Sequence, residues 1–480
     1  MTEHFDRIWQ RGRGAFRSGK SAALARTLAL SSLVGLGRRT VAGMICTAGG
    51  QSGDWSRYYR LFEAGRFDHR ELFGAVVDEV LELGDPGAPV VVAVDDTIVR
   101  KSGRKTAGAS WRRDPTGPHF RTNLVLGQRF LQLSLAVCEA EAGQPGGARM
   151  LPVEFLHCPT AVKPGKRGTE QQRDDYRRQA RQLALSRRAV ECLDHLRGHL
   201  DAHGHGRRRL VVVGDGGFTN HTVVANLPRA TGFIGRIRKD AKLFAAPGEA
   251  DAGRPGPGRR RLYGPRLPTP EQIRRDESVP WQHVPAFAAG RVHDFRVKSV
   301  GVRWKPAGGR DLRLVVIEPL AYRPTLGSRV RYREPAHLIC TDPDMPLDQL
   351  LQSYLWRWEI EVNFRDEKQL LGAGQANVRT PTAVQLVPAL IVAAYAMLHL
   401  ACIKCFGKDA TTLMPRPKWR NKPPRRLTTA DATALLRADV WQPQLQLPNC
   451  DGFANAPPHT TKPPKRLNTL QSAVLYARMT

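Results

Sequence analysis

The sequence predicts an α/β protein with a helical N-terminal region, a core of buried strands and helices, and a mostly β insertion. Three observations predict this arrangement. Two apolar runs rich in valine each end in aspartate, which is typical of strands buried on both faces. Residues 347–371 contain no Gly or Pro and are rich in helix-forming residues, which predicts a helix. Residues 241–335 are rich in Pro, Gly and Arg and then strand-like, which predicts the β-rich insertion.

Length and charge limit the classes of protein that fit. A chain of 480 residues can bury a large core and form two or three domains. Its net charge of +30 is spread from end to end, so we expect a polyanionic partner, and nucleic acid fits best. A membrane surface is the competing partner, but no basic cluster flanks a true span, and we expect no membrane association. Eight scattered cysteines fit a reducing compartment, so we expect a cytoplasmic protein.

The N-terminal region, residues 1–85, reads as helical. Residues 41–46 and a segment that begins after Asp54, a good N-cap residue, predict two short helices around a Gly-rich turn. With Arg57 and Arg60 on the second helix, the pair would suit a helix-turn-helix that contacts DNA. An ordinary small helical bundle is the alternative.

The first buried strand is predicted at residues 90–94, within the run PVVVAVDDT. It ends in Asp95 and Asp96. Two carboxylates at the end of a buried strand are costly unless solvent or a metal ion stabilises them, although one of the two can also cap a turn.

The next segments extend the core. After a loop rich in cations, residues 123–127 and 129–137 predict two strands that form a meander with the first, and residues 151–156 predict a further strand. A polar loop then leads to a predicted long helix that runs to about His199.

The second buried strand, at residues 210–213, repeats the design of the first, and Asp215 follows it within the run GDGG. Gly-Asp turns are common, so Asp215 gains its interest from being a second aspartate after a buried strand. The glycines permit close approach of backbone or ligand. A strand at residues 232–238 then supplies Arg236 and Arg238 for phosphate contacts.

The later regions are assigned mainly by composition. Trp304 in the insertion is a candidate for stacking on a base extruded from a duplex, and packing within the insertion is the alternative. Residues 386–403 approach membrane-spanning length but contain Pro388 and His399, which favours a core helix. The predicted regions are 1–85 (helical N-terminal domain), 86–240 and 336–405 (the two parts of the core), 241–335 (β-rich insertion) and 406–480 (basic, Pro-rich C-terminal region).

The helix predicted at residues 347–371 carries the most informative pattern. At 100° per residue, Tyr354, Arg357, Glu361 and Lys368 share an arc of about 60°. Glu361 can hold a divalent cation, Arg357 and Lys368 can hold phosphates, and Tyr354 can hydrogen-bond or stack. A neighbouring apolar stripe would face the core and consists of Leu351, Leu355, Trp358 and Val362. The alternative is a solvated helix face with surface ion pairs.

The spacing Tyr354-x2-Arg357-x3-Glu361-x6-Lys368 resembles, without departure, the Y-R-E-K signature of bacterial insertion-sequence transposases of the DDE type. The resemblance implies an RNase H-like catalytic core interrupted by an insertion. It also implies an Asp-x-Thr pattern after the first strand, which selects Asp95 as a metal ligand and leaves Asp96 as second choice.

The resemblance implies that Asp95, Asp215 and Glu361 converge on two Mg²⁺ or Mn²⁺ ions about 4 Å apart, which serve in-line displacement at phosphorus. Water would attack first, and the freed 3′-OH would then attack another phosphate.

The implied protein is a DDE transposase that binds the inverted-repeat ends of an insertion sequence, cuts them and inserts them into a double-stranded DNA target. Pairing of two ends suggests a homodimer on DNA, and a hairpin intermediate is a hypothesis that the signature permits. The alternatives are an RNase H-like endonuclease without strand transfer and an inactive DNA-binding derivative of a transposase.

Overall fold

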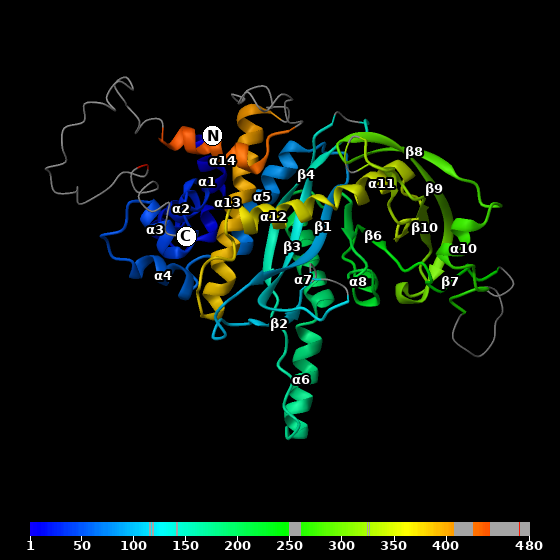
Figure 1. The fold of residues 1–480 in the computed structure, drawn as a ribbon, viewed down its shortest axis with the longest axis horizontal. Coiled ribbons are helices and arrows are strands. Elements are labelled where there is room, and N and C mark those ends of the chain that lie inside the picture. Colours follow the sequence, from blue (N-terminus) through cyan, green and yellow to red (C-terminus); the bar gives the residue numbers. More distant parts are fainter. Residues whose placement is uncertain are drawn as a thin grey trace.

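The computed structural model describes residues 1–114, 117, 120–140, 143–248, 261–323, 325, 327–407, 426–441 and 470. Helices cluster at one end of the molecule, a large twisted sheet runs through the middle, and strands β8, β9 and β10 lie at the far end (Figure 1). The basic, Pro-rich segments assigned to the C-terminal region lie outside the described residues. Within that region, the structure describes the helix α14 (Thr429–Trp441).

The central sheet contains eleven strands among the described residues, in the order β2-β3-β1-β5-β6-β13-β10-β9-β7, with β4 beside β3 and β8 beside β9. Strands β1, β3 and β4 are antiparallel neighbours, whereas β1, β5 and β6 run parallel. This large mixed sheet is consistent with the expected RNase H-like core. Its first six strands are β1 (Val90–Arg100), β2 (Ser110–Arg113), β3 (Leu124–Cys138), β4 (Ala148–His157), β5 (Leu210–Gly214) and β6 (Thr231–Arg236).

Strands that follow β6 continue this sheet. Strand β13 pairs with β6 through Leu338 and Arg236, and β10 and β9 follow it in antiparallel pairing. The elements of this part of the chain are β7 (Leu243–Phe244), α10 (Pro270–Arg275), β8 (Gln282–Ala288), β9 (Arg291–Trp304), η2 (Lys305–Ala307), β10 (Leu312–Ile317), β11 (Ala321–Tyr322), β12 (Arg331–Tyr332) and β13 (Ala336–Cys340). The assigned domain boundaries stay predictions.

Two strand predictions were wrong in extent. Strand β1 does not stop before Asp95, because the residues from Asp95 to Arg100 keep antiparallel pairing with β3. The runs predicted as two strands form the single strand β3, since Gln128 between them remains paired with Val99.

The predicted long helix before β5 is two helices, α6 (Glu170–Gln182) and α7 (Leu185–Ala202). Ala184, at ψ 129°, interrupts the helical backbone between them. Helix α6 buries no side chain and projects from the body of the molecule, whereas α7 buries an apolar face (Figure 1). Helix α6 therefore does not pack on the sheet, because its sequence provides no apolar face to bury.

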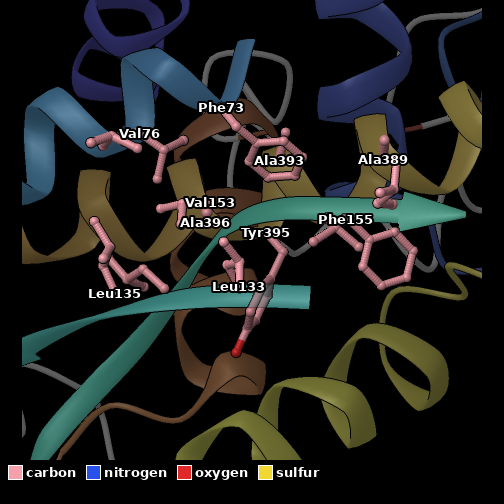
Figure 2. Close-up of a cluster of buried hydrophobic side chains, with 14 of the residues drawn as sticks. Phe73, Val76, Leu133, Leu135, Val153, Phe155, Ala389, Ala393, Tyr395 and Ala396 are labelled. Carbon is pink, nitrogen blue, oxygen red and sulfur yellow. The ribbon is translucent and has the colours of Figure 1, made fainter. Parts of the chain in front are cut away.

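Helix α13 (Pro381–Phe406) forms the centre of the helical layer. Among the described helices it is the one that is long and apolar enough to cross a membrane, yet 94% of its most apolar window is buried in the protein. It packs against β4 and helices α1, α2 and α5, and Figure 2 shows Ala389, Ala393 and Tyr395 beside Phe73 of α5 and Phe155 of β4. The prediction of a core helix is confirmed.

The helices before the sheet begin the chain. Helices α3 and α4 flank the Gly-rich turn, but Trp55 occupies the N-cap position of α4, and Asp54 accepts a hydrogen bond from the Ser56 amide instead. The remaining elements of the chain are α1 (Thr2–Arg11), η1 (Gly12–Ala15), α2 (Gly19–Val34), α3 (Val41–Thr47), α4 (Ser56–Glu63), α5 (His69–Leu83), α8 (His221–Ala225), α11 (Leu347–Trp356) and α12 (Glu359–Gln369).

Candidate active site

Strand register places two of the predicted carboxylates side by side. The parallel pairing of β1 and β5 ends with Val94 opposite Gly214. Asp95 directly follows Val94, and Asp215 directly follows Gly214. Buried valines on both strands hold this register. Asp215 then turns the chain, because its Oδ1 accepts the Gly217 amide at 2.8 Å.

Successive side chains along a strand point to opposite faces of the sheet, so Asp95 and Asp96 of β1 lie on different faces. Val91 and Ala93, which share the face of Asp95, pack in the same buried cluster as Ile360 and Phe364 of α12. Asp96 lies on the opposite face, which Val92 and Val94 bury within the cluster that includes the side chains of α7. Asp95 is therefore on the face that the signature helices cover.

The helix that carries the signature is broken. Helix α11 ends at Trp356 and α12 begins at Glu359, and the amide of Glu361 bonds the carbonyl of Trp358 at 3.1 Å, three residues back. Such tightening of a turn is common at helix ends. The prediction of one continuous helix was wrong. The predicted apolar stripe is confirmed for Leu351, which is buried, and for Leu355, which packs against the same cluster, but it was wrong for Trp358, which is 60% exposed.

Helix α12 is fixed to the sheet by polar contacts. Asn363 Nδ2 donates to Ser134 Oγ at 3.3 Å and to the Met150 carbonyl at 3.0 Å. Lys368 Nζ donates to Thr97 Oγ1 at 2.9 Å, two residues beyond Asp95 on β1. This contact fastens α12 to β1, and the prediction that Lys368 holds phosphate stays a prediction.

Arg357 links the third predicted carboxylate to the first. Its Nη1 lies 3.2 Å from Asp95 Oδ2 and 3.9 Å from Glu361 Oε1. Its guanidinium also lies 6.0 Å from the centre of the Tyr354 ring. Asp95, Glu361, Arg357 and Tyr354 thus gather around one point, with Asp215 beside Asp95.

Burial and charge make this point favourable for a cation. Burial, followed by the charge of Asp215, raises the pKa of Asp95 to about 7, although Arg357 opposes the shift. Burial also raises the pKa of Asp96 and lowers that of Lys368. Carboxylates forced together favour a bound cation, and hard oxygen ligands suit a divalent ion of the magnesium or manganese type. The residues therefore fit a divalent metal ion.

The three acids do not yet lie close enough together to form one set of metal ligands. Among the described residues, the group whose ligand atoms all lie within 4.8 Å of one another is Asp78, His199 and His203, and the acids at positions 95, 215 and 361 do not form such a group. Arg357 stands between Asp95 and Glu361 instead.

Two hollows flank the acids. One of about 1600 Å³ is lined by Tyr354, Arg357 and Arg236, among others. The other, of about 920 Å³, is lined by Gly216, which follows Asp215, and by Arg236, Arg238 and Trp304. Arg236 thus borders both hollows, next to the carboxylates.

The other predicted DNA contacts have partners within the protein. Arg238 is paired with Asp240 at 2.9 Å and stays largely exposed. Trp304 is half-buried at the end of β9, where it pairs with Leu243 of β7. Both side chains nevertheless line the smaller hollow.

A comparison with protein families identifies the family of the chain. Residues 15–295 match the family described as DDE superfamily endonuclease. The chain belongs to this family. No curated protein matches the chain. DDE endonucleases act on DNA and use divalent metal ions, which agrees with the acids at the ends of the parallel pairing.

The family match covers Asp95 and Asp215 but ends before α11. In this DDE endonuclease, the third acid therefore has no support from the match, and its place follows from the packing of α12 on the face of Asp95. Sequence reasoning also missed two anchors of that helix, Asn363 and Thr97. Thr97 falls in the Asp-x-Thr pattern, but nothing in the pattern announced that it would bind Lys368.

Proposed function

We propose that this DDE endonuclease is a transposase that binds the inverted-repeat ends of an insertion sequence, cleaves them and transfers the freed strands to target DNA. One observation carries the proposal: the last parallel pair of β1 and β5 sets Asp95 beside Asp215 on the sheet face covered by α12, which bears Glu361. The Y-R-E-K spacing around Glu361 adds the resemblance to insertion-sequence transposases.

In this proposal Asp95, Asp215 and Glu361 would hold two Mg²⁺ or Mn²⁺ ions. Such ions would supply activation of the attacking oxygen and stabilisation of the leaving oxygen. Asp95 takes the first ligand position rather than Asp96, because Asp96 points to the other face of the sheet.

The basic side chains around the acids would position the DNA. When bound metal ions neutralise the acids, Arg357 would exchange its contact with Asp95 for a contact with a DNA phosphate. Arg236 would contact the DNA backbone between the two hollows. Tyr354 supports Arg357, and Trp304 offers a surface for an unstacked base. Binding of two ends by a homodimer, passage through a hairpin and residence on the nucleoid belong to the same proposal.

A strand-transfer assay tests the proposal. The purified protein is incubated with pre-cut, labelled ends from the DNA that flanks its gene, together with a supercoiled target and Mg²⁺. We expect joined product from the wild-type protein and none from Asp215→Ala or Glu361→Ala. Asp348→Asn, an exposed acid on α11, is the matched control and should join normally.

The outcomes separate the alternatives. Cleavage of uncut ends without any joining indicates an endonuclease that does not transfer strands. DNA binding without metal-dependent cleavage indicates an inactive derivative. If hairpin ends never appear in cleavage reactions while free 5′-phosphorylated flanks do, the hairpin step is wrong.

A further inference from the structure

A second cluster of metal-ligating side chains lies between helices α5 and α7. Asp78 is on α5, His199 is in the last turn of α7, and His203 is the C-cap residue of α7. Each residue offers one ligand atom, and these atoms all lie within 4.8 Å of one another. No part of the proposed transposition chemistry uses them.

The three side chains are already oriented toward one another. His199 Nε2 lies 2.7 Å from Asp78 Oδ1, and the two imidazole rings stack with their centroids 4.0 Å apart. His203 Nδ1 lies 2.9 Å from the His199 carbonyl oxygen. Because a carbonyl oxygen can only accept, Nδ1 carries the hydrogen of this bond, and Nε2 of the neutral ring keeps a free lone pair.

The backbone of α5 makes room for this arrangement at Gly74. A Cβ atom at Gly74 would lie 2.9 Å from Cε1 of His199, so any side chain there would displace the ring. Glycine inside a helix costs about 1 kcal/mol relative to alanine, and here it leaves space for one imidazole.

The electrostatic surroundings also suit a cation. Arg11, outside the cluster, interacts electrostatically with Asp78. Its guanidinium forms ion pairs with Glu79 and Glu82.

We propose that Asp78, His199 and His203 bind a zinc ion that clamps α5 to α7. Two imidazoles and a carboxylate with water as the fourth ligand form a common zinc set, and the exposed edge at His203 admits water. Zinc would replace the proton shared by His199 and Asp78, which requires their 2.7 Å separation to widen to about 3.3 Å for tetrahedral bonds near 2 Å.

The clamp would join the last helix before the sheet to a helix of the core. Side chains of both helices belong to the buried cluster on the side of the sheet opposite to Glu361. Its role is therefore structural, and it stands or falls independently of the proposed catalysis.

Zinc binding to the full-length protein tests the proposal, measured by calorimetry in excess Mg²⁺ so that the carboxylate site is occupied. We expect one tight zinc ion per chain and a higher melting temperature with zinc. His203→Ala, an exposed position that should fold normally, is expected to weaken this binding by about tenfold or more and to abolish the thermal shift. Gly74→Ala should weaken it by displacing the His199 ring.

His205→Ala is the matched control, because it removes a histidine two residues from the cluster and should leave zinc affinity unchanged. Cobalt provides a second readout: the wild-type protein should show the visible bands of tetrahedral Co²⁺ with nitrogen and oxygen ligands, and His203→Ala should not. Equal zinc affinity in wild type and His203→Ala, equal loss in His205→Ala, or thiolate-to-cobalt charge-transfer bands would each overturn the assignment.

Discussion

Helix α12 presents acids to two contrasting environments. On its outer edge Glu361 is 45% exposed, and its nearest cation, Arg357, is 3.9 Å away. On its inner side Glu367 is buried, and burial raises its pKa to about 8, so this carboxyl stays mostly protonated at neutral pH. The same residue type, less than two turns apart, is accessible and beside a cation in one place and neutral and enclosed in the other.

The inner side is also rich in fixed partners. Asn363 bonds Ser134, the Met150 carbonyl and, through its Oδ1, the hydroxyl of Tyr395, while Asp366 accepts from Thr429. The outer edge has few such partners. The comparison teaches that the inner polar groups hold the helix in place, whereas the outer acid is left available for a cation.

Replacing each acid by its amide should separate the two environments most strongly. Glu361→Gln is expected to reduce Mg²⁺-dependent DNA cleavage by about three orders of magnitude, because it removes a charged ligand at the reacting phosphate. Glu367→Gln should stay within about tenfold of wild type, since a neutral side chain replaces a neutral one. Single-turnover cleavage of labelled ends measures both, and near-normal cleavage by Glu361→Gln would contradict the assignment.

The next comparison concerns the neighbouring acids of β1. Asp95→Asn should lose cleavage to an extent similar to Glu361→Gln, whereas Asp96→Asn should retain it within about tenfold, because Asp96 faces away from α12. The same cleavage assay decides. The reverse ranking of the two variants would mean that Asp96 is the ligand.

Asn363→Ala should reveal the holding role of the inner side. It removes the hydrogen bonds of Asn363 to the Tyr395 hydroxyl and the Met150 carbonyl in a buried site, so we expect a loss of about 3 kcal/mol in the free energy of unfolding. Arg365→Ala, on the exposed side of the same helix, should change it by less than about 0.5 kcal/mol. Denaturant titration of both variants measures the difference, and equal losses would remove the contrast.

The smallest effect is expected in the pH dependence of stability. Because the pKa of Glu367 is raised from 4.5 to about 8 on folding, its contribution is fully present below pH 4.5 and is lost as pH rises through 8. Glu367→Gln should make the decline of stability between pH 5 and 8 shallower, by at most about 1.4 kcal/mol per pH unit. Asp95 adds a similar decline below pH 7, which should persist in this variant. An unchanged slope would show that Glu367 is not protonated in the folded protein.

The sequence predicted the parts of the fold that depend on local pattern. The valine runs before Asp95 and Asp215 became buried strands, and the apolar segment around Pro388 became the core helix α13. The predictions were wrong for elements whose extent depends on partners far away in the sequence. Strand β1 continues past Asp95 only because β3 pairs with it, and no local signal in its own sequence shows that.

The site was predictable to a similar degree. Residue type and spacing selected the acids and Arg357, and the structure brings Asp95, Arg357 and Glu361 together. The break after Trp356 and the internal role of Lys368 could not be predicted, because both depend on how α12 rests on Thr97 and Ser134. Choosing between Asp95 and Asp96 required the face on which α12 packs.

The burial of α13 has a consequence for biosynthesis. Apart from α14, the elements that pack against it, among them α1, α2, α5 and β4, precede it in the chain and leave the ribosome before it does. A segment with the length and hydropathy of a membrane span thus emerges when most of its protein docking surface has already been synthesised. The order of the elements along the chain therefore shortens the time during which this helix is open to aggregation or to the membrane-insertion machinery.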